Sequence, residues 1–209
     1  MAWAHRYLGE AALTAGDLTV ARPHFELQHD LARHVGDAWI QASAANMLAQ
    51  VSRYQRRYDQ ATRELRQALD GFRATDDPDG AATVLNSLGE VARDAGKPAE
   101  AQALFRVALR GHRQVGSVRG IAADLEGLAT TAAQQSETRS ALVYLGAAQA
   151  LRQANGGPLL PPEQAIIDRL LEANLGSLSQ PDREQALAEG RARPLDQIIT
   201  AALDGGAQL

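Results

Sequence analysis

The chain has 209 residues, a formal net charge of −4, no cysteine and an aromatic content of only 4%. Without cysteine, disulfides and cysteine-based zinc sites are excluded, and the acidic balance argues against a nucleic-acid-binding module, which needs a basic surface. No apolar run approaches the roughly 20 residues of a membrane span, and the first residues are not a signal peptide. We therefore expect a cytoplasmic protein without direct nucleic-acid or membrane contact. Its core must come from Ala, Leu and Val, and Ala and Leu favour helices, so an all-α fold is expected.

The first half of the chain is predicted to form two helical hairpins. The first spans residues 1–37 and ends at Gly36, a typical C-cap glycine. The second spans residues 38–79 and turns at 55–57. Asp59 follows this turn, and its carboxylate is expected to cap the next helix by accepting hydrogen bonds from the free amides of the first turn.

Two further hairpins follow. The third spans residues 80–119 and turns at 96–98. Pro98 suits the first position of a helix, because its missing N–H donor is not needed there. The fourth hairpin spans residues 120–155 and has no glycine in its turn.

Residues 156–209 are predicted to form a linker and helices that cap the array. The Gly- and Pro-rich stretch 156–162 is the junction, a final helix starts at Pro194, and 204–209 form a frayed end. The last unit of a solenoid exposes an apolar face unless something covers it. An apolar stripe at helical spacing is expected to do so: Ile166, Ile167, Leu170, Leu171 and Leu175.

Three apolar rows recur every 40 residues through the four hairpins. They are Leu8, Leu48, Leu88 and Leu128; Ala21, Ala61, Ala101 and Ala141; and Phe25, Leu65, Phe105 and Leu145. Rows that keep one register over four copies indicate a repeat array, which offers a broad surface rather than a deep catalytic pocket.

Within each copy a Leu-Gly pair is followed by a small residue, then by Ala and by an aromatic residue or Leu. The order is clearest in Leu8-Gly9, Ala12, Ala21, Phe25 and in Leu88-Gly89, Ala92, Ala101, Phe105. This pattern resembles the tetratricopeptide repeat, with a period of about 40 residues instead of about 34 and with Ala49 and Ala129 in place of the glycine. The resemblance implies a right-handed superhelical solenoid of about four helical hairpins.

The C-terminal region shows a second resemblance. Residues 144–152, 156–163, 189–192 and 195–199 follow an order that is similar to the C-terminal end of bacterial ATPase regulators of the STAND and LuxR-like type. In those proteins a nucleotide-binding module precedes a tetratricopeptide sensor arm. The resemblance covers only the arm, because the chain has no Gly-rich phosphate loop and no helix-turn-helix reader. It implies an interaction or sensor role in a signalling or transcriptional regulator.

The sequence offers no convincing catalytic or metal site. His24, His29 and His34 are five residues apart and turn away from one helical face, whereas a helical zinc pair needs a spacing of about three or four. The acidic stretch 76–80 lacks the Glu that a calcium loop needs at its last ligand position, and it is predicted to be a turn and N-cap cluster. No serine lies in a Gly-x-Ser-x-Gly elbow. We expect a protein that is not an enzyme and that needs no cofactor.

The remaining functional surface is the concave face, which the first helix of each repeat lines in tetratricopeptide arrays. The resemblance implies that positions beside the Leu-Gly pair contact a protein or peptide ligand. These positions are Arg6, Glu10, Asn46, Gln50, Arg53, Asn86, Glu90, Arg93, Glu126 and Thr130. Asparagine both donates to and accepts from a peptide backbone, which suits an extended ligand. The alternative is that these polar side chains only face solvent.

The N-terminal end has no capping element before it, because residues 2–15 already match a repeat. Trp3 and Tyr7 close that face, a partner covers it, or the chain is cut from a longer array. Two copies could also pair there as a homodimer through Trp3, Tyr7 and Leu8. A self-associating structural module is thus one alternative to a peptide-binding scaffold, and a receptor for a small molecule or a peptide pheromone is another.

Overall fold

The computed structural model describes residues 1–155, 157, 159, 161–174 and 178–205, apart from the side chains at 161, 162, 170 and 174. These residues form eleven α-helices and no strand. The helices are α1 (Ala2–Thr14), α2 (Leu18–Val35), α3 (Ala38–Tyr54), α4 (Tyr58–Ala74), α5 (Pro78–Asp94), α6 (Pro98–Val115), α7 (Val118–Gln134), α8 (Thr138–Asn155), α9 (Pro161–Asn174), α10 (Gln180–Ala192) and α11 (Leu195–Leu203). None of the described helices is both long and apolar enough to cross a membrane.

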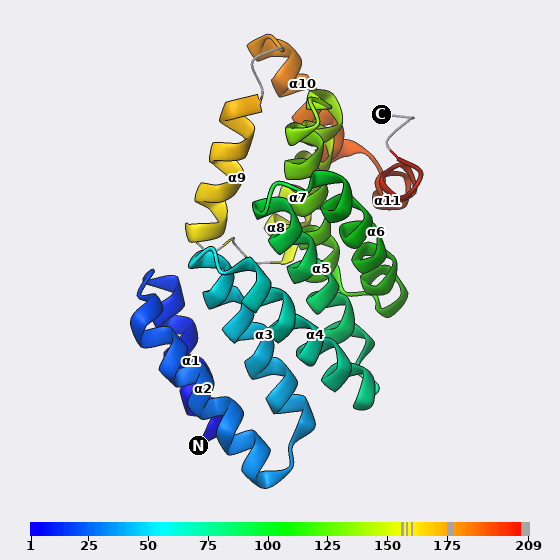
Figure 1. Cartoon of the computed structure of the whole chain (residues 1–209). Helices are drawn as coiled ribbons and strands as arrows, with labels where there is room; N and C mark the ends of the chain where they lie inside the picture. Colours follow the sequence, from blue (N-terminus) through cyan, green and yellow to red (C-terminus); the bar gives the residue numbers. More distant parts are fainter. Residues whose placement is uncertain (156, 158, 160, 175–177, 206–209) are drawn as a thin grey trace.

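Helices α1 to α8 form four stacked hairpins (Figure 1). A short turn joins the two helices of each hairpin, and the second helix also packs against the first helix of the next hairpin. The expected all-α solenoid of helical hairpins is confirmed. The third and fourth hairpins begin at Pro78 and Val118, slightly before the expected boundaries at 80 and 120.

The turns inside the hairpins repeat the 40-residue period in the backbone. Gly16, Arg56, Gly96 and Ser136 all adopt the left-handed conformation, with φ between 59° and 77°. Glycine reaches this region without steric cost, whereas a residue with a Cβ atom is strained there. Arg56 and Ser136 therefore adopt a backbone conformation that is unfavourable for residues with a Cβ atom. We infer that the packing of the two helices imposes the turn.

Three helices begin with an aspartate that caps their free amides. Asp17, Asp37 and Asp77 each accept a hydrogen bond from a backbone amide three residues later, at 2.9 to 3.1 Å. The turn and cap cluster expected at 76–80 is thus confirmed. The prediction that Asp59 caps a helix is wrong, because α4 begins before it and Asp59 lies inside the first turn.

The two helices of a hairpin approach closely through a small residue on the first helix and a large residue on the second. A Cβ atom added at Gly9 would come within 2.6 Å of the Phe25 ring, and one added at Gly89 within 2.8 Å of the Phe105 ring. Both rings are fully buried. At the matching positions the other two hairpins have alanine on the first helix and leucine on the second: Ala49 and Leu65, and Ala129 and Leu145. The larger residue on one helix always accompanies the smaller one on the other, as close packing requires.

The odd-numbered helices form the inner layer of the array. α1 contacts α3, α3 contacts α5, and α5 contacts α7, whereas the even-numbered helices contact chiefly the odd helices on either side. Because the odd-numbered helices lie closer together, the array curves with its concave face on them.

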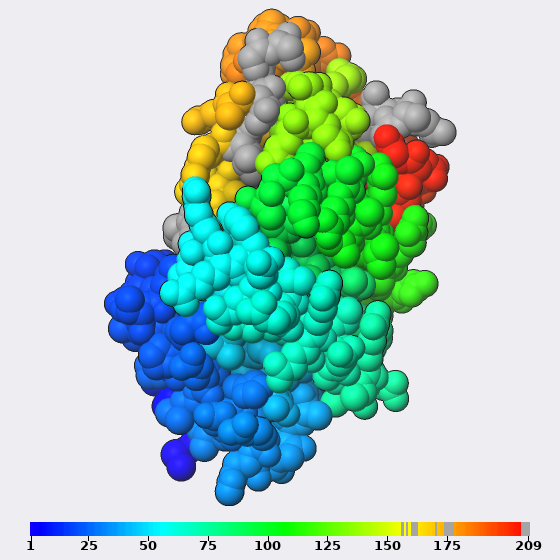
Figure 2. Space-filling model, in the orientation of Figure 1, coloured from blue at the N-terminus to red at the C-terminus, as the bar shows by residue number. Residues whose placement is uncertain are grey.

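The end of the array is closed by α10, which packs along α8 (orange in Figure 2). The two helices touch backbone to backbone. Gly146 lies against the carbonyl of Leu187, and Gly190 lies against the carbonyl of Val143, so neither glycine has room for a side chain. α11 adds contacts to α8 and α6.

Part of the apolar stripe expected to cover the last hairpin lies against it. Ile167 and Leu171 are buried, and α9 packs on α7, the first helix of that hairpin, while α10 packs on its second helix, α8. Leu175 and the side chain of Leu170 lie outside the described residues. So do parts of the expected junction and frayed end, namely 156, 158, 160 and 206–209.

A mutant cycle tests the hairpin contact. Gly89→Ala should lower the free energy of unfolding by about 2 kcal/mol, because the new methyl group overlaps the Phe105 ring. Phe105→Leu alone should also cost about 1–2 kcal/mol by leaving a void. The double variant recreates the Ala129–Leu145 pair of the fourth hairpin and should recover at least about 1 kcal/mol relative to the sum of the single effects. Urea denaturation measures all three, and strictly additive losses would contradict the pairing.

Candidate functional site

Polar side chains on the inner layer link each odd-numbered helix to the next. Three hydrogen bonds, each between residues 37 positions apart, join α1 to α3, α3 to α5 and α5 to α7 at 2.6, 3.1 and 3.2 Å. The donor and acceptor pairs are Arg6 Nη1 to Ser43 Oγ, Gln50 Nε2 to Ser87 Oγ, and Arg93 Nη1 to Thr130 Oγ1. The concave face therefore presents a continuous polar ladder above the apolar core.

Arg53 stands at the centre of this ladder. Its Nη1 donates to Asp94 at 2.8 Å, its Nη2 lies 3.3 Å from a Glu90 oxygen, and its Nε donates to Gln50 at 3.0 Å. The guanidinium carbon also lies 4.6 Å from the centre of the Tyr54 ring. Burial alone would lower the pKa of Arg53. The nearby carboxylates, of which Glu90 has the largest effect, raise the pKa by more than burial lowers it, so the side chain stays charged. Burial raises the pKa of Tyr54 to about 12.

Glu126 of α7 is held by Arg152 of α8. Arg152 donates from Nε and Nη2 to the two carboxylate oxygens at 2.5 and 2.6 Å, which makes a bidentate pair. Burial raises the pKa of Glu126, and the contact with Arg152 opposes that shift.

Helix α9 adds a half-buried carboxyl group, that of Glu163, to this end of the concave face (α9 beside α7 in Figure 1). Burial raises the pKa of Glu163, in its first turn, to about 7, and the negative charge of Glu90 adds to the shift. Arg53 and Arg152 act in the opposite direction. Because α9 packs on α7, it covers the part of the ladder that lies nearest the C-terminus.

Residues 40–114, from α3 to the end of α6, match the tetratricopeptide repeat family. The match and the stacked helical hairpins together support one assignment. Residues 40–114 are a tetratricopeptide-repeat segment. No curated protein matches it. Tetratricopeptide repeats generally mediate protein–protein interaction on a non-enzymatic scaffold, which supports a non-catalytic binding role for this chain.

The ten residues that the sequence placed beside the Leu-Gly pairs all lie on the odd-numbered helices of the repeat array. Four are half-buried and reach the surface: Arg6, Glu10, Gln50 and Glu90. The other six are buried: Asn46, Arg53, Asn86, Arg93, Glu126 and Thr130. A ligand on the concave face would therefore first meet the half-buried side chains.

The two asparagines of this set differ in their bonding. Asn86 donates to Asp124 at 2.7 Å inside the array. The Oδ1 atom of Asn46 is buried and has no hydrogen-bond partner among the described residues. Asn46 therefore has an acceptor that no described residue of the chain uses.

Sequence reasoning missed several members of the ladder. Ser43 and Ser87 stand beside the column of predicted residues, and their shared distance of 37 from a polar donor is a signal that the repeat register contains. Arg152 and Glu163 carry no such signal, because their partners lie in other helices without any repeat correspondence.

A second buried polar cluster lies between α5, α6 and α7. His112 Nδ1 and Asp124 Oδ2 are 2.6 Å apart, and His112 Nε2 lies 3.4 Å from Thr83 Oγ1. Burial raises the pKa of Asp124 to about 6. Hydroxyl, imidazole and carboxylate follow the order of an acyl-transfer triad, but the Thr83 hydroxyl lies 3.4 Å from an imidazole that is only 1% exposed. The cluster is a structural link between two hairpins.

The residues proposed for self-association lie on the outer face of α1. Tyr7 is 64% exposed and Leu8 is 52% exposed. Trp3 is partly covered, with its ring centre 5.9 Å from that of Trp39. In the part of the chain that the structure describes, no group of three His, Asp or Glu side chains is placed to hold a metal ion.

The half-buried carboxyl group of Glu163 predicts that the docking of α9 depends on pH. The docked state raises the pKa of Glu163 from its ordinary value of 4.5 to about 7, so it binds the proton more tightly than the undocked state. Docking is therefore strongest below about pH 4.5 and weakens as the pH rises to about 7. Amide hydrogen exchange in α9 should be about tenfold faster, beyond the intrinsic effect of pH, at about pH 8 than at about pH 5.

Glu163→Gln should remove this difference, because the amide does not titrate. Glu172→Gln changes an exposed carboxyl group on the same helix and should keep it. If the wild-type chain shows no such difference, or if both variants behave alike, Glu163 does not control the docking of α9.

Proposed function

We propose that this chain is a non-catalytic interaction arm whose concave face binds an extended protein or peptide segment. The observation that carries the proposal is the polar ladder on the odd-numbered helices. Its half-buried members, above all Glu10, Gln50 and Glu90, offer carboxylate and amide groups at the surface. Such groups pair with the backbone and the polar side chains of an extended ligand.

Helix α9 restricts where that ligand binds. It packs on α7, so the part of the concave face formed by α1, α3 and α5 is the more accessible part. A ligand that extends towards Glu126 must displace the first turn of α9, whose Glu163 interacts with the same charges. Binding and the position of α9 are therefore coupled.

We further propose that the arm belongs to a cytoplasmic signalling or transcriptional regulator of the STAND or LuxR-like type. The support is the order of the C-terminal segments, in which Gly146 and Gly190 are two of the shared residues. Both lie at the contact between α8 and α10, where no side chain fits. The reading frame upstream of residue 1 tests this role: a phosphate-loop module in frame supports it, and a stop codon contradicts it.

The concave-face proposal predicts which side chains a ligand needs. Peptides selected from a random display library against the wild-type chain should bind the double variant Glu10→Ala/Gln50→Ala at least about tenfold more weakly, because two polar contacts are lost. Fluorescence anisotropy measures the affinity, and circular dichroism shows whether the fold is kept. Glu10 and Gln50 are chosen because they reach the surface, whereas the side chains of Asn86 and Arg93 are buried and form hydrogen bonds within the array.

The matched control is Arg110→Ala/Arg119→Ala, which changes two exposed arginines on α6 and α7 that form no side-chain hydrogen bond or ion pair with another described residue. It should leave the affinity within about twofold. Selected peptides that lose affinity only with the control variant, or with neither variant, would place binding away from the concave face.

Self-association is a second candidate function, favoured by the exposure of Tyr7 and Leu8. In the second and fourth hairpins the residue matching Leu8 is largely covered, with Leu48 at 9% and Leu128 at 1% exposure. This apolar face of α1 would therefore gain from a second copy of the chain.

Sedimentation should then show a dimer at high protein concentration that Tyr7→Glu/Leu8→Glu abolishes, since buried charges oppose the contact. Val107→Glu/Val115→Glu places the same charges at exposed apolar positions of α6 and should leave the dimer unchanged. A wild-type chain that stays monomeric would exclude this candidate.

A further inference from the structure

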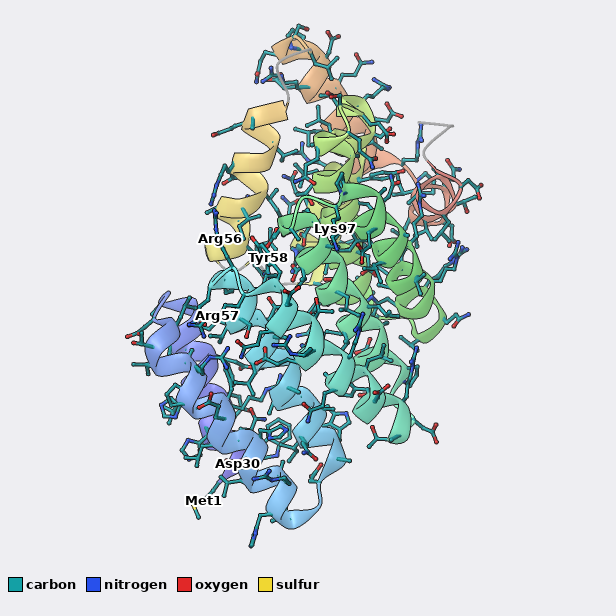
Figure 3. The ribbon with its side chains drawn as sticks, in the orientation of Figure 1. Met1, Asp30, Arg56, Arg57, Tyr58 and Lys97 are labelled. Atoms are coloured by element: carbon teal, nitrogen blue, oxygen red, sulfur yellow. The ribbon has the colours of Figure 1, made fainter. Side chains whose placement is uncertain are left out.

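A groove with a volume of about 660 Å³ lies at the junction of the second and third hairpins, away from the concave ladder. Its walls are the first half of α4 and the start of α6, and its floor is α5. Four of its lining residues gather at the edge of the array where α4 and α6 begin: Arg56, Arg57, Tyr58 and Lys97 (Figure 3). Arg63 and Arg66 continue the α4 wall one and two turns further along.

The groove is basic in an acidic protein. Five basic side chains line it, namely those four arginines and Lys97, against the two carboxylates of Asp59 and Glu100, which gives a formal charge of +3. The whole chain has a formal net charge of −4. A cleft lined by one sign of charge attracts ligands of the opposite sign.

The four arginines of the groove are exposed and unpaired. None of them forms an ion pair or a side-chain hydrogen bond with another residue in the described parts of the chain. Lys97 alone has a carboxylate partner, Glu100, at 3.4 Å. The guanidinium groups are thus free to bind carboxylates in the bidentate mode that arginine favours.

The repeat does not require arginine at these positions. The residues 40 positions earlier are Gly16, Asp17, Pro23 and Glu26, and those 40 positions later are Gly96, Lys97, Ala103 and Arg106. Arginine occupies all four positions only in the second hairpin. Arg106 also differs in its contacts, because its Nε donates to the Ala202 carbonyl at 2.9 Å.

Two of these arginines are unfavourable for the local backbone structure. Arg56 has a φ of 59°, where the first and third hairpins have glycine. Arg57 precedes α4 without capping it, where the first hairpin has the capping Asp17. A cation at this end of a helix is also repelled by the helix dipole. Residues that cost stability at a surface are typical of binding sites.

The floor of the groove is apolar. Leu88, Val91 and Ala92 of α5 and Leu104 of α6 line it between the charged walls. Leu88 and Leu104 are only partly buried, so apolar surface remains for a ligand to cover. A simple inorganic anion would leave this floor exposed, whereas a peptide with both carboxylate and aliphatic side chains matches both parts.

We propose that this groove binds an acidic segment of a partner protein, with carboxylates on Arg56, Arg57, Arg63 and Arg66 and an aliphatic side chain on Leu88 and Leu104. The α4 wall from Arg56 to Arg66 extends about 15 Å at 1.5 Å per helical residue. An extended strand of about four or five residues spans that distance. This surface is separate from the concave face, and neither proposal depends on the other.

Fluorescence anisotropy with the full chain tests the proposal. The probe is a fluorescein-labelled peptide of about twelve residues that alternates Glu or Asp with Leu, at about 0.15 M salt. The double variant Arg63→Glu/Arg66→Glu should bind it at least about tenfold more weakly than the wild type. The control Arg110→Glu/Arg119→Glu makes the same change in net charge at two exposed, unpaired arginines elsewhere, and should weaken binding by less than about threefold.

The composition of the peptide tests the two parts of the groove. Replacing Glu and Asp by Gln and Asn should abolish binding, and replacing Leu by Ser should weaken it about tenfold. Equal losses in both arginine variants would show attraction by net charge alone and overturn the proposal. So would a Ser peptide that binds as well as the Leu peptide. Glu10→Ala/Gln50→Ala should bind the acidic peptide normally, so failure at this groove and failure at the concave face are distinguishable.

Discussion

The close contact between one small residue on the first helix and one large residue on the second determines the geometry of every hairpin. In two hairpins glycine lies against phenylalanine, Gly9 against Phe25 and Gly89 against Phe105, and the other two hairpins have alanine and leucine at these positions. The contact fixes how closely the helices approach and therefore how the turn between them must run. The strained left-handed conformation of Arg56 is a consequence, since the turn has to follow the helices.

This constraint also separates the residues that stabilise the fold from those that are free to bind. The repeated alanine, leucine and phenylalanine rows fill the core, so the remaining positions vary between copies at little cost to packing. The concave ladder uses such positions to tie the inner helices together. The arginines of the α4–α6 groove use others, and they occur together in one hairpin only.

Local sequence patterns predicted the hairpins, the apolar rows and the cap at Asp77, because all of these depend on neighbouring residues or on the repeat register. The helix start near Asp59 was misplaced because the turn position is fixed by helix packing, which the sequence alone does not show. The contact of α10 with α8 was not visible in the sequence, because it depends on Gly146 and Gly190 lying against carbonyls of the opposite helix.

The same reason explains what the sequence revealed of the binding surfaces. The column of Asn46 and Asn86 was visible in the register, but the bond from Asn86 to Asp124 was not, because it joins two hairpins. Two of the groove arginines lie in the loop before α4, and the other two lie in α4 itself. Only the folded chain shows that Lys97 and Leu88 from the next hairpin complete the same surface.

The separation of fold residues from binding residues is tested most directly by giving the second hairpin the residues of the first. The triple variant Arg56→Gly/Arg57→Asp/Arg66→Glu removes the left-handed strain and adds a helix cap, each worth about 1 kcal/mol. Its unfolding midpoint and its affinity for the acidic peptide should be measured on the same sample. We predict a higher midpoint together with a large loss of affinity. A variant that is less stable, or one that keeps its affinity, would contradict the account.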